Sequence, residues 1–380
     1  MLFWKNVMLI GRNSLGITRS ILLNKQALYL GSNFDWSKTK HILSEVFAGN
    51  LAIYPTMEQV TKANGKVAKD TAVVLSTSGS TGAAKQIEIS KEAILASHQM
   101  VEDYFGNPTK VQWLLALSPE RVAGLQVLIR AFLSDADLAV LSDLMHFDVK
   151  DFIEATAQLP HIKGQRRVSL VPTQLAKLLE DQEGLLALKT FDAVLIGGGP
   201  MWKELKEKAA RQQLNIVQTY GMTESCGGCV YNGKPLKDVQ VAIEADSRIS
   251  LAGPILANNL GDKFITEDKG QLSETGILQV LGRADDVIIT GGIKVSAHKV
   301  AEQIQELPNV QESFVMGVSD KQWGQKLVAF IVGEPDVLEI KAKTKTLTKA
   351  AVPKEIIKVP EIPYLASGKP DRQKLLESYT

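Results

Sequence analysis

A hydroxyl-rich loop is the first candidate for chemistry, as a binding site for a phosphate group. The stretch Ala72–Ser90 begins with an apolar run, continues through serines, threonines and glycines, and then reaches Lys85. Glycines let the backbone wrap around an anion, hydroxyl and N–H groups donate to phosphate oxygens, and a lysine adds a mobile positive charge. It is not a Walker A loop, because the Gly-Lys-Ser/Thr cluster is absent. A plain surface turn is the alternative, but the strand before the loop favours phosphate binding.

A second candidate lies further along the chain, at Tyr220, Thr223 and Glu224. A tyrosine ring can stack on a flat base, a threonine hydroxyl can donate to a phosphate, and a carboxylate can bind Mg²⁺, which prefers oxygen ligands. Three glycines at 197–199 follow the apolar run DAVLI and remove side chains where a flat ring must approach. A capped turn and a plain strand-to-helix turn are the respective alternatives.

An α/β domain must position these residues. Nearly continuous apolar runs such as VQWLLALS and FDAVLIGGG alternate with amphipathic segments such as GLQVLIRAFLSD and MWKELKEKAARQQ. This alternation is typical of a parallel sheet with helices on both faces. Ligands of such sheets bind at the carboxyl ends of the strands. We therefore expect the hydroxyl-rich loop and the later motifs to follow strands of that sheet.

The pattern changes twice after the α/β part. Short alternating pieces with turn residues predict a small antiparallel β subdomain at about 234–283. Beyond it, a strand, helix, strand, strand and helix follow in turn, which predicts a separate α+β domain. We expect an N-terminal domain over residues 1–283, which includes the subdomain, and a C-terminal domain over residues 284–380.

The composition limits the kinds of partner. The 380-residue chain has 43 Lys and Arg against 42 Asp and Glu, without a block of like charge, which favours small molecules over nucleic acids. No stretch has the roughly 18 apolar residues that a membrane span needs. Cys226 and Cys229 lack the partners of a zinc site and predict reduced thiols in a cytoplasmic protein. His98, His146 and His161 show no metal spacing, and we expect them at the surface or in loops.

Four motifs resemble the adenylate-forming superfamily of acyl-CoA synthetases, adenylation domains and luciferases. STSGSTGAAK resembles its phosphate loop, QTYGMTES its central motif, GRADDVIITGG its hinge motif and SGKPDRQKL its C-terminal lysine motif. A single match would be weak, whereas four matches in the family's order are specific. The resemblance implies that ATP, Mg²⁺ and CoA bind, and that the small C-terminal domain is mobile.

The resemblance also assigns roles to single residues. It implies that Lys369, Lys85, Thr223 and Glu224 are catalytic and that Glu224 binds the metal ion. The implied nucleotide contacts are Thr77, Ser78, Gly79, Ser80, Thr81, Gly82, Gly198, Gly199, Tyr220, Gly221, Thr223, Asp268 and Arg283. The implied acyl-site residues are Arg121, Gly124, Gly197, Gly198 and Gly221, the hinge is Asp285, and Gly291 and Gly292 line the CoA channel.

Within the superfamily, the chain is similar to the o-succinylbenzoate–CoA ligases of menaquinone biosynthesis. The likeness rests on the segments WLLALSPERVAGLQVLIRAFLSDADL, SLVPTQLAKLL, AVLIGGGP and YGMTESCGGCVYNGKPLKDVQV, and on a short N-terminal part. Arg121 stands where the family commonly has a histidine. Its guanidinium could pair with the second, aromatic carboxylate of o-succinylbenzoate, or it could simply face solvent. Cys226 and Cys229 could line the acyl pocket as small apolar groups.

Two alternatives stay open at this point. Another aryl- or acyl-CoA ligase, or a stand-alone adenylation enzyme, would keep all four motifs. A non-catalytic nucleotide-binding relative is the second alternative, and the presence of Lys85, Glu224, Asp285 and Lys369 argues against it. A homodimer could cover the adenine side, since the part before the phosphate loop is short.

Overall fold

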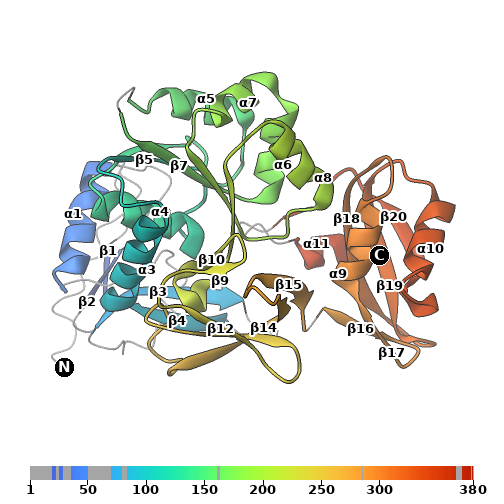
Figure 1. Cartoon of the computed structure of the whole chain (residues 1–380). Coiled ribbons are helices and arrows are strands. Elements are labelled where there is room, and N and C mark those ends of the chain that lie inside the picture. The colour runs from blue at the N-terminus through green and yellow to red at the C-terminus, as the bar shows by residue number, and fades with distance from the viewer. Residues whose placement is uncertain are drawn as a thin grey trace.

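The computed structural model describes residues 19–22, 25–28, 36–49, 70–78, 84–160, 163–284, 286–364, 370–377 and 379. Figure 1 shows a large N-terminal part and a smaller C-terminal part, which join near β15 and β16. The expected α/β fold with a small C-terminal domain is confirmed. The boundary between residues 283 and 284 stays a prediction.

A seven-stranded sheet forms the centre of the N-terminal part, in the order β11-β10-β9-β8-β7-β5-β6. Strands β5 to β9 run parallel to their neighbours, whereas β10 and β11 are antiparallel. The strands are β5 (Val111–Leu115), β6 (Asp137–Val140), β7 (Gln165–Leu170), β8 (Ala193–Ile196), β9 (Ile216–Met222), β10 (Gly227–Tyr231) and β11 (Lys234–Pro235). The helices of this part are α1 (Trp36–Phe47), α3 (Lys91–Tyr104), α4 (Val122–Leu133), α5 (Val149–Ala157), α6 (Pro172–Glu180), α7 (Gln182–Leu188) and α8 (Lys203–Arg211).

Side chains on both faces of this sheet are buried, as the continuous apolar runs predict. In β5, Trp113 and Leu115 belong to one core cluster, while Leu114 belongs to another. Successive side chains of a strand point to opposite faces, so a strand covered on both sides must be apolar throughout. The clusters bring in α4 residues such as Leu125 on one face and Phe152 of α5 on the other.

The strand before the hydroxyl-rich loop does not belong to this sheet, which corrects the sequence-based expectation. Strand β3 (Thr71–Ser78) pairs with β4 (Ala84–Ser90) in a separate two-stranded antiparallel sheet. Ile87 and Ile89 are buried at alternate positions of β4, which is the period of a strand with one face on the core. The loop is thus the turn of a hairpin and not the end of a parallel strand.

A four-stranded antiparallel sheet follows the central sheet along the chain. It contains β12 (Gln240–Ile243), β13 (Arg248–Ala252), β14 (Lys263–Leu272) and β15 (Leu278–Arg283) in sequence order. Each strand pairs with the next in antiparallel fashion, as the alternating pattern predicts, through short turns except for the ten-residue connection 253–262 between β13 and β14. Asp268 of β14 lies opposite Arg283 of β15 in this register.

The C-terminal part has its own five-stranded sheet and its own core. Strand β19 (Gly324–Gly333) pairs with β16 (Val287–Thr290), β18 (Val310–Asp320) and β20 (Glu355–Lys358), and β17 (Ile293–Ser296) pairs with β16. Helices α9 (Ala297–Gln305), α10 (Val337–Lys345) and α11 (Arg372–Glu377) complete it. Leu327 and Phe330 of β19 belong to different core clusters, so this sheet is also covered on both faces.

Two further features complete the description. A hairpin of β1 (Arg19–Leu22) and β2 (Lys25–Leu28) lies near the N-terminus, where the sequence analysis predicted no strand. Among the described residues, no helix is both long and apolar enough to cross a membrane.

Candidate active site

The carboxyl edge of the parallel strands gathers one group of the expected site residues. Gly197–Gly199 follow β8, and Tyr220 lies near the end of the neighbouring strand β9. Arg121 ends the loop after β5 and is the N-cap residue of α4. The carboxyl ends of parallel strands meet at one edge of the sheet, so these segments share that edge.

Tyr220, Asp268 and Arg283 come together from three strands. The Tyr220 hydroxyl donates to Asp268 Oδ2 at 3.0 Å, and Arg283 Nη1 lies 3.7 Å from Asp268 Oδ1. Burial raises the pKa of Tyr220, and the Asp268 carboxylate raises it further. The phenol therefore stays protonated and keeps donating to Asp268. This contact fixes the edge of the Tyr220 ring. The face of an aromatic ring is the part suited to stack on an adenine base.

A one-turn 3₁₀ helix, η1 (Thr223–Ser225), carries Thr223 and Glu224 directly after β9. The Ser225 hydroxyl accepts from Met222 N at 3.0 Å and donates to Gly227 O at 2.9 Å. Gln126 of α4 donates through Nε2 to Cys226 O at 2.7 Å, just beyond the turn. The Gln126 contact ties the turn to α4, whose N-cap residue is Arg121.

The turn offers a ligand that suits a magnesium ion. Glu224 is half-buried, and its backbone oxygen accepts from Ala257 N at 3.0 Å, so the main chain beneath the carboxylate is held in place. Among the described residues no cluster of three or more His, Cys, Asp or Glu side chains could hold a metal ion. A single carboxylate fits a Mg²⁺ ion that keeps waters and takes its other ligands from nucleotide phosphates.

Several expected site glycines are also required by the protein's own packing. A Cβ at Gly221 would lie 1.9 Å from Gly227 O, and one at Gly124 would lie 2.3 Å from Ser118 O. At Gly197 it would lie 2.5 Å from the Thr219 hydroxyl. Gly199 differs, because a Cβ there would make only ordinary contacts with Pro172 at 3.9 Å. Clearance for a ligand is thus not needed to explain the first three glycines.

The phosphate-loop residues lie partly outside the described structure. Gly79, Ser80, Thr81 and Gly82 are outside the described residues, and Thr77 and Ser78 are placed in β3 by their backbone. Lys85 lies on β4 opposite Thr77 and is exposed. Their roles stay predictions.

Backbone hydrogen bonds change partner on either side of Asp285, the expected hinge, which itself lies outside the described residues. Ala284 N donates to Glu267 O of β14 at 2.6 Å. Asp286 O accepts from Ala297 N, at the start of α9, at 3.1 Å. Asp286 N also donates to Arg283 O of β15 at 3.4 Å. Ala284 is thus bound to the N-terminal part, and Asp286 has hydrogen bonds to both parts, as is expected for residues beside a hinge.

Gly291 and Gly292, the expected CoA-channel residues, form the two-residue loop of the β16–β17 hairpin. Their φ angles are +55° and +79°, as a type I′ turn requires. A role in CoA binding stays a prediction. Lys369 lies outside the described residues, between Tyr364 and Pro370, which form an isolated antiparallel bridge.

Arg121 and the two cysteines have surroundings that the sequence could not reveal. Arg121 is partly exposed, yet its Nε is buried and has no hydrogen-bond partner among the described residues. Cys226 and Cys229 are free and buried, and burial raises their pKa values to about 12 and about 11. They are therefore neutral thiols.

The sequence analysis overlooked some polar residues in the core behind the site. Gln126 and Arg130 of α4 are almost fully buried, and neither Gln126 Oε1 nor Arg130 Nε has a hydrogen-bond partner within the described structure. Two polar residues four positions apart in an otherwise apolar helix were the available signal. His98 of α3 is half-buried, contrary to expectation, and burial lowers its pKa.

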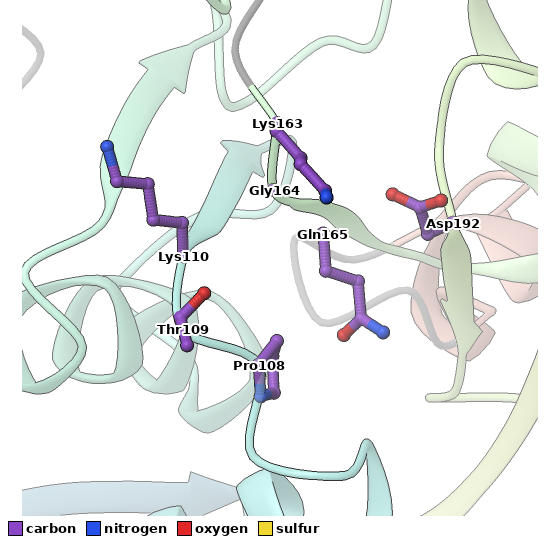
Figure 2. A pocket seen from close by; sticks show the side chains of 7 residues that line it. All are labelled: Pro108, Thr109, Lys110, Lys163, Gly164, Gln165 and Asp192. Carbon is purple, nitrogen blue, oxygen red and sulfur yellow. The ribbon is translucent and has the colours of Figure 1, made fainter.

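A surface hollow lies at the opposite, amino-terminal edge of the sheet (Figure 2). It is lined by Pro108, Thr109, Lys110, Lys163, Gly164, Gln165 and Asp192. In Figure 2 the Lys163 and Asp192 side chains approach each other, while Lys110 points away. None of the motif residues lines this hollow, so we place the candidate active site at the carboxyl edge.

Comparison with known families supports the motif assignment. The family described as AMP-binding enzyme matches residues 22–275, and the AMP-binding enzyme C-terminal domain matches residues 299–369. A Mycobacterium tuberculosis protein named probable 2-succinylbenzoate–CoA ligase is 37% identical over 329 residues, covering 82% of this chain and 85% of that protein. A Listeria monocytogenes 2-succinylbenzoate–CoA ligase is 31% identical, covering 81% and 70%.

Solved structures share the fold. The o-succinylbenzoate CoA synthetase of Bacillus subtilis, in complex with its acyl-adenylate intermediate, has a TM-score of 0.67 at 24% identity, covering 92% of this chain and 78% of that one. The same enzyme with ATP and a magnesium ion also has a TM-score of 0.67, at 24% identity and with 92% and 79% covered. With the family match over most of the sequence and a relative that is 37% identical, this chain belongs to the AMP-binding enzyme family, within the adenylate-forming superfamily.

Proposed function

We propose that the protein is an ATP-dependent acid–CoA ligase that converts o-succinylbenzoate into o-succinylbenzoyl-CoA. The observation that carries the proposal is the joining of Tyr220, Asp268 and Arg283 at the carboxyl edge, next to the Thr223–Glu224 turn. The relatives named 2-succinylbenzoate–CoA ligase support the choice of acid.

The reaction has two steps. In the first, a carboxylate oxygen of the acid attacks the α-phosphorus of ATP, the bond to the β-phosphate breaks, and pyrophosphate leaves. In the second, the thiolate of CoA attacks the acyl carbonyl and AMP leaves. Negative charge accumulates on the α-phosphate in the first step, so preorganised donors such as Thr223, Lys85 and Lys369 would lower its barrier. When bound at Glu224, Mg²⁺ would supply positive charge to the phosphate oxygens.

The remaining roles follow from position. Asp268 and Arg283 would hold the ribose hydroxyls, with Tyr220 against the base. Asp285 would act as the hinge about which the C-terminal domain turns between the two steps, and the glycine turn at 291–292 would then border the CoA channel. The same proposal includes that the protein forms a homodimer and that it acts in menaquinone synthesis.

An acid panel tests the function. Purified protein is incubated with ATP, Mg²⁺, CoA and a set of aromatic and aliphatic acids, and AMP and thioester are measured. We expect o-succinylbenzoate to have the highest kcat/KM. A higher value with another acid would favour a different acyl-CoA ligase, and transfer to a carrier protein in place of CoA would indicate a stand-alone adenylation enzyme. Absence of acid-dependent ATP–pyrophosphate exchange would indicate a non-catalytic relative.

Arg121 is proposed to recognise the aromatic carboxylate of the substrate. Its buried Nε has no partner among the described residues, and a charged hydrogen bond contributes about 1.5–3 kcal/mol. We expect Arg121→Gln to raise the KM for o-succinylbenzoate by about tenfold or more. The KM for 4-oxo-4-phenylbutanoate, which keeps the succinyl carboxylate but lacks the aromatic one, should stay within about twofold.

Arg211→Gln is the matched control, because Arg211 is an exposed arginine of α8 whose nearest acidic partner, Glu207, is 3.9 Å away. It should leave both KM values unchanged. An equal rise for the two acids in Arg121→Gln would remove this role.

A further inference from the structure

The two ends of the segment that contains Lys369 are held together at its base. Tyr364 and Pro370 form an antiparallel bridge, and Asp371 N donates to Pro363 O at 2.7 Å. Asp371 also caps α11, since its Oδ1 accepts from Gln373 N at 3.2 Å. Residues 365–369 therefore start and end at one place on the C-terminal domain.

A side chain from each end ties this base to a different element. The Tyr364 hydroxyl donates to Glu312 of β18. On the other end, the Arg372 guanidinium pairs with Asp286, and its Cζ lies 5.8 Å from the ring centre of Phe314. Lys369 is only three residues before Arg372 along the chain.

Asp286 is the part of this arrangement that connects to domain rotation. It directly follows the expected hinge residue. Its backbone oxygen accepts from Ala297 N of α9 in the C-terminal domain, and its backbone N donates to Arg283 O of β15 at 3.4 Å. A residue that is held from both sides next to the rotation axis moves little when the domain turns. A side chain that is bound to Asp286 therefore keeps its position relative to that axis.

We propose that the Arg372–Asp286 ion pair is a positioning device, which fixes the base of the Lys369 segment relative to the hinge so that the lysine reaches the α-phosphate in the adenylation step. The proposal rests on the proposed function, because it needs Lys369 to act in that step. It gives Arg372 and Asp286 no contact with substrate.

Loss of the Arg372–Asp286 ion pair should affect catalysis more than it affects the stability of the fold. The Arg372 side chain is 52% exposed and that of Asp286 is 20% exposed. Exposed ion pairs contribute little to stability, because water and salt screen them. Catalysis is far more sensitive, since misplacing a reacting group by about 1 Å can cost about a hundredfold in rate. Loss of the pair should thus slow one chemical step and barely change the unfolding midpoint.

The test compares the two half-reactions in Arg372→Ala, Asp286→Ala and the double variant. Adenylation is measured as acid-dependent pyrophosphate release, and thioester formation in a single turnover from supplied acyl-adenylate and CoA. We expect each single variant to lower the kcat of adenylation by about tenfold, with KM values and thioester formation within about twofold of wild type. The double variant should be no slower than the slower single variant, because both remove one interaction.

Lys343→Ala is the matched control. Lys343 of α10 pairs with Glu306 at 3.0 Å in the same domain, and the two side chains are 37% and 40% exposed. It should leave both half-reactions unchanged. Equal slowing of both half-reactions, an unchanged adenylation rate, or additive losses in the double variant would each overturn the proposal. The acid used is whichever one the wild-type protein activates, so failure of o-succinylbenzoate as substrate counts against the proposed function alone.

Discussion

The two halves of the candidate active site are held by different kinds of contact. In the N-terminal half, the turn after β9 is tied down by a buried contact, in which Gln126 donates to Cys226 O. In the C-terminal half, the ion pair that flanks the Lys369 segment includes the half-exposed Arg372. A buried hydrogen bond costs about 1–3 kcal/mol when one partner is removed, whereas an exposed ion pair contributes about 0–1 kcal/mol.

This difference suits a division of labour between the halves. The residues that would hold the nucleotide are preorganised and would stay in place through both reaction steps. The residues that would deliver the lysine sit on the C-terminal domain, where Asp286, next to the expected hinge, has backbone hydrogen bonds to both parts. Changes in the first half should therefore affect stability as well as rate. Changes in the second half should slow one reaction step more than the other.

The largest effect that would sharpen this comparison is expected for Lys369→Ala. Removing a preorganised positive group from the adenylation transition state should lower acid-dependent ATP–pyrophosphate exchange by about 10²–10³-fold. Thioester formation from supplied acyl-adenylate should stay within a few-fold of wild type, since the proposed domain rotation would withdraw the lysine before that step. Equal losses in the two assays would mean that the lysine does not act in one step only.

A smaller effect, on both stability and rate, is expected for Gln126→Leu in the N-terminal half. The substitution leaves Cys226 O without its donor, while it also removes the unpartnered Oε1 of Gln126, so the two effects partly offset. We expect the free energy of unfolding to fall by about 1 kcal/mol and adenylation to slow by several-fold, measured by urea denaturation and pyrophosphate release.

Gln99→Leu is the control for this change. Gln99 of α3 also makes a side-chain hydrogen bond, to Asp103 at 2.9 Å, but at an exposed position. It should change the unfolding free energy by less than about 0.5 kcal/mol. If Gln126→Leu proves as mild as this control in both measurements, the N-terminal half is not held by buried contacts in the way described.

The last test concerns the buried thiols beside the turn. Their pKa values are raised by burial from 9.0 to about 12 for Cys226 and about 11 for Cys229. Between pH 9 and 11 the folded chain keeps these protons while the unfolded chain loses them, so stability must fall as pH rises through that window. The double variant Cys226→Ala/Cys229→Ala should show a shallower decline of unfolding free energy over this range; an unchanged slope would mean that the thiols titrate normally.

Some of the site was predictable from sequence because short motifs set local geometry. The apolar run before residues 197–199 and the one before Tyr220 predict strands, and the parallel arrangement of those strands brings their ends to one edge. Each of these inferences needs only neighbours along the chain or one general rule of sheet topology.

The placement of β3 could not be predicted in the same way. Its apolar run is typical of a parallel strand, and the alternation of Ile87 and Ile89 in β4 was the overlooked signal for a hairpin. Which partner a strand takes depends on competing long-range contacts, and local propensity does not decide between them. The same holds for Gln126, whose partner Cys226 is 100 residues away.

The sequence by itself determined the superfamily, the α/β class and the residue types available for binding a nucleotide, because these follow from motif order and hydrophobic period. Only the tertiary structure decided that Tyr220 donates to Asp268, that Gln126 holds the turn after β9, and that Arg372 meets Asp286. Such pairs join segments far apart in the chain. Their geometry arises when separate elements pack, since the free energy that selects one partner over another comes from burial and desolvation of the whole assembly.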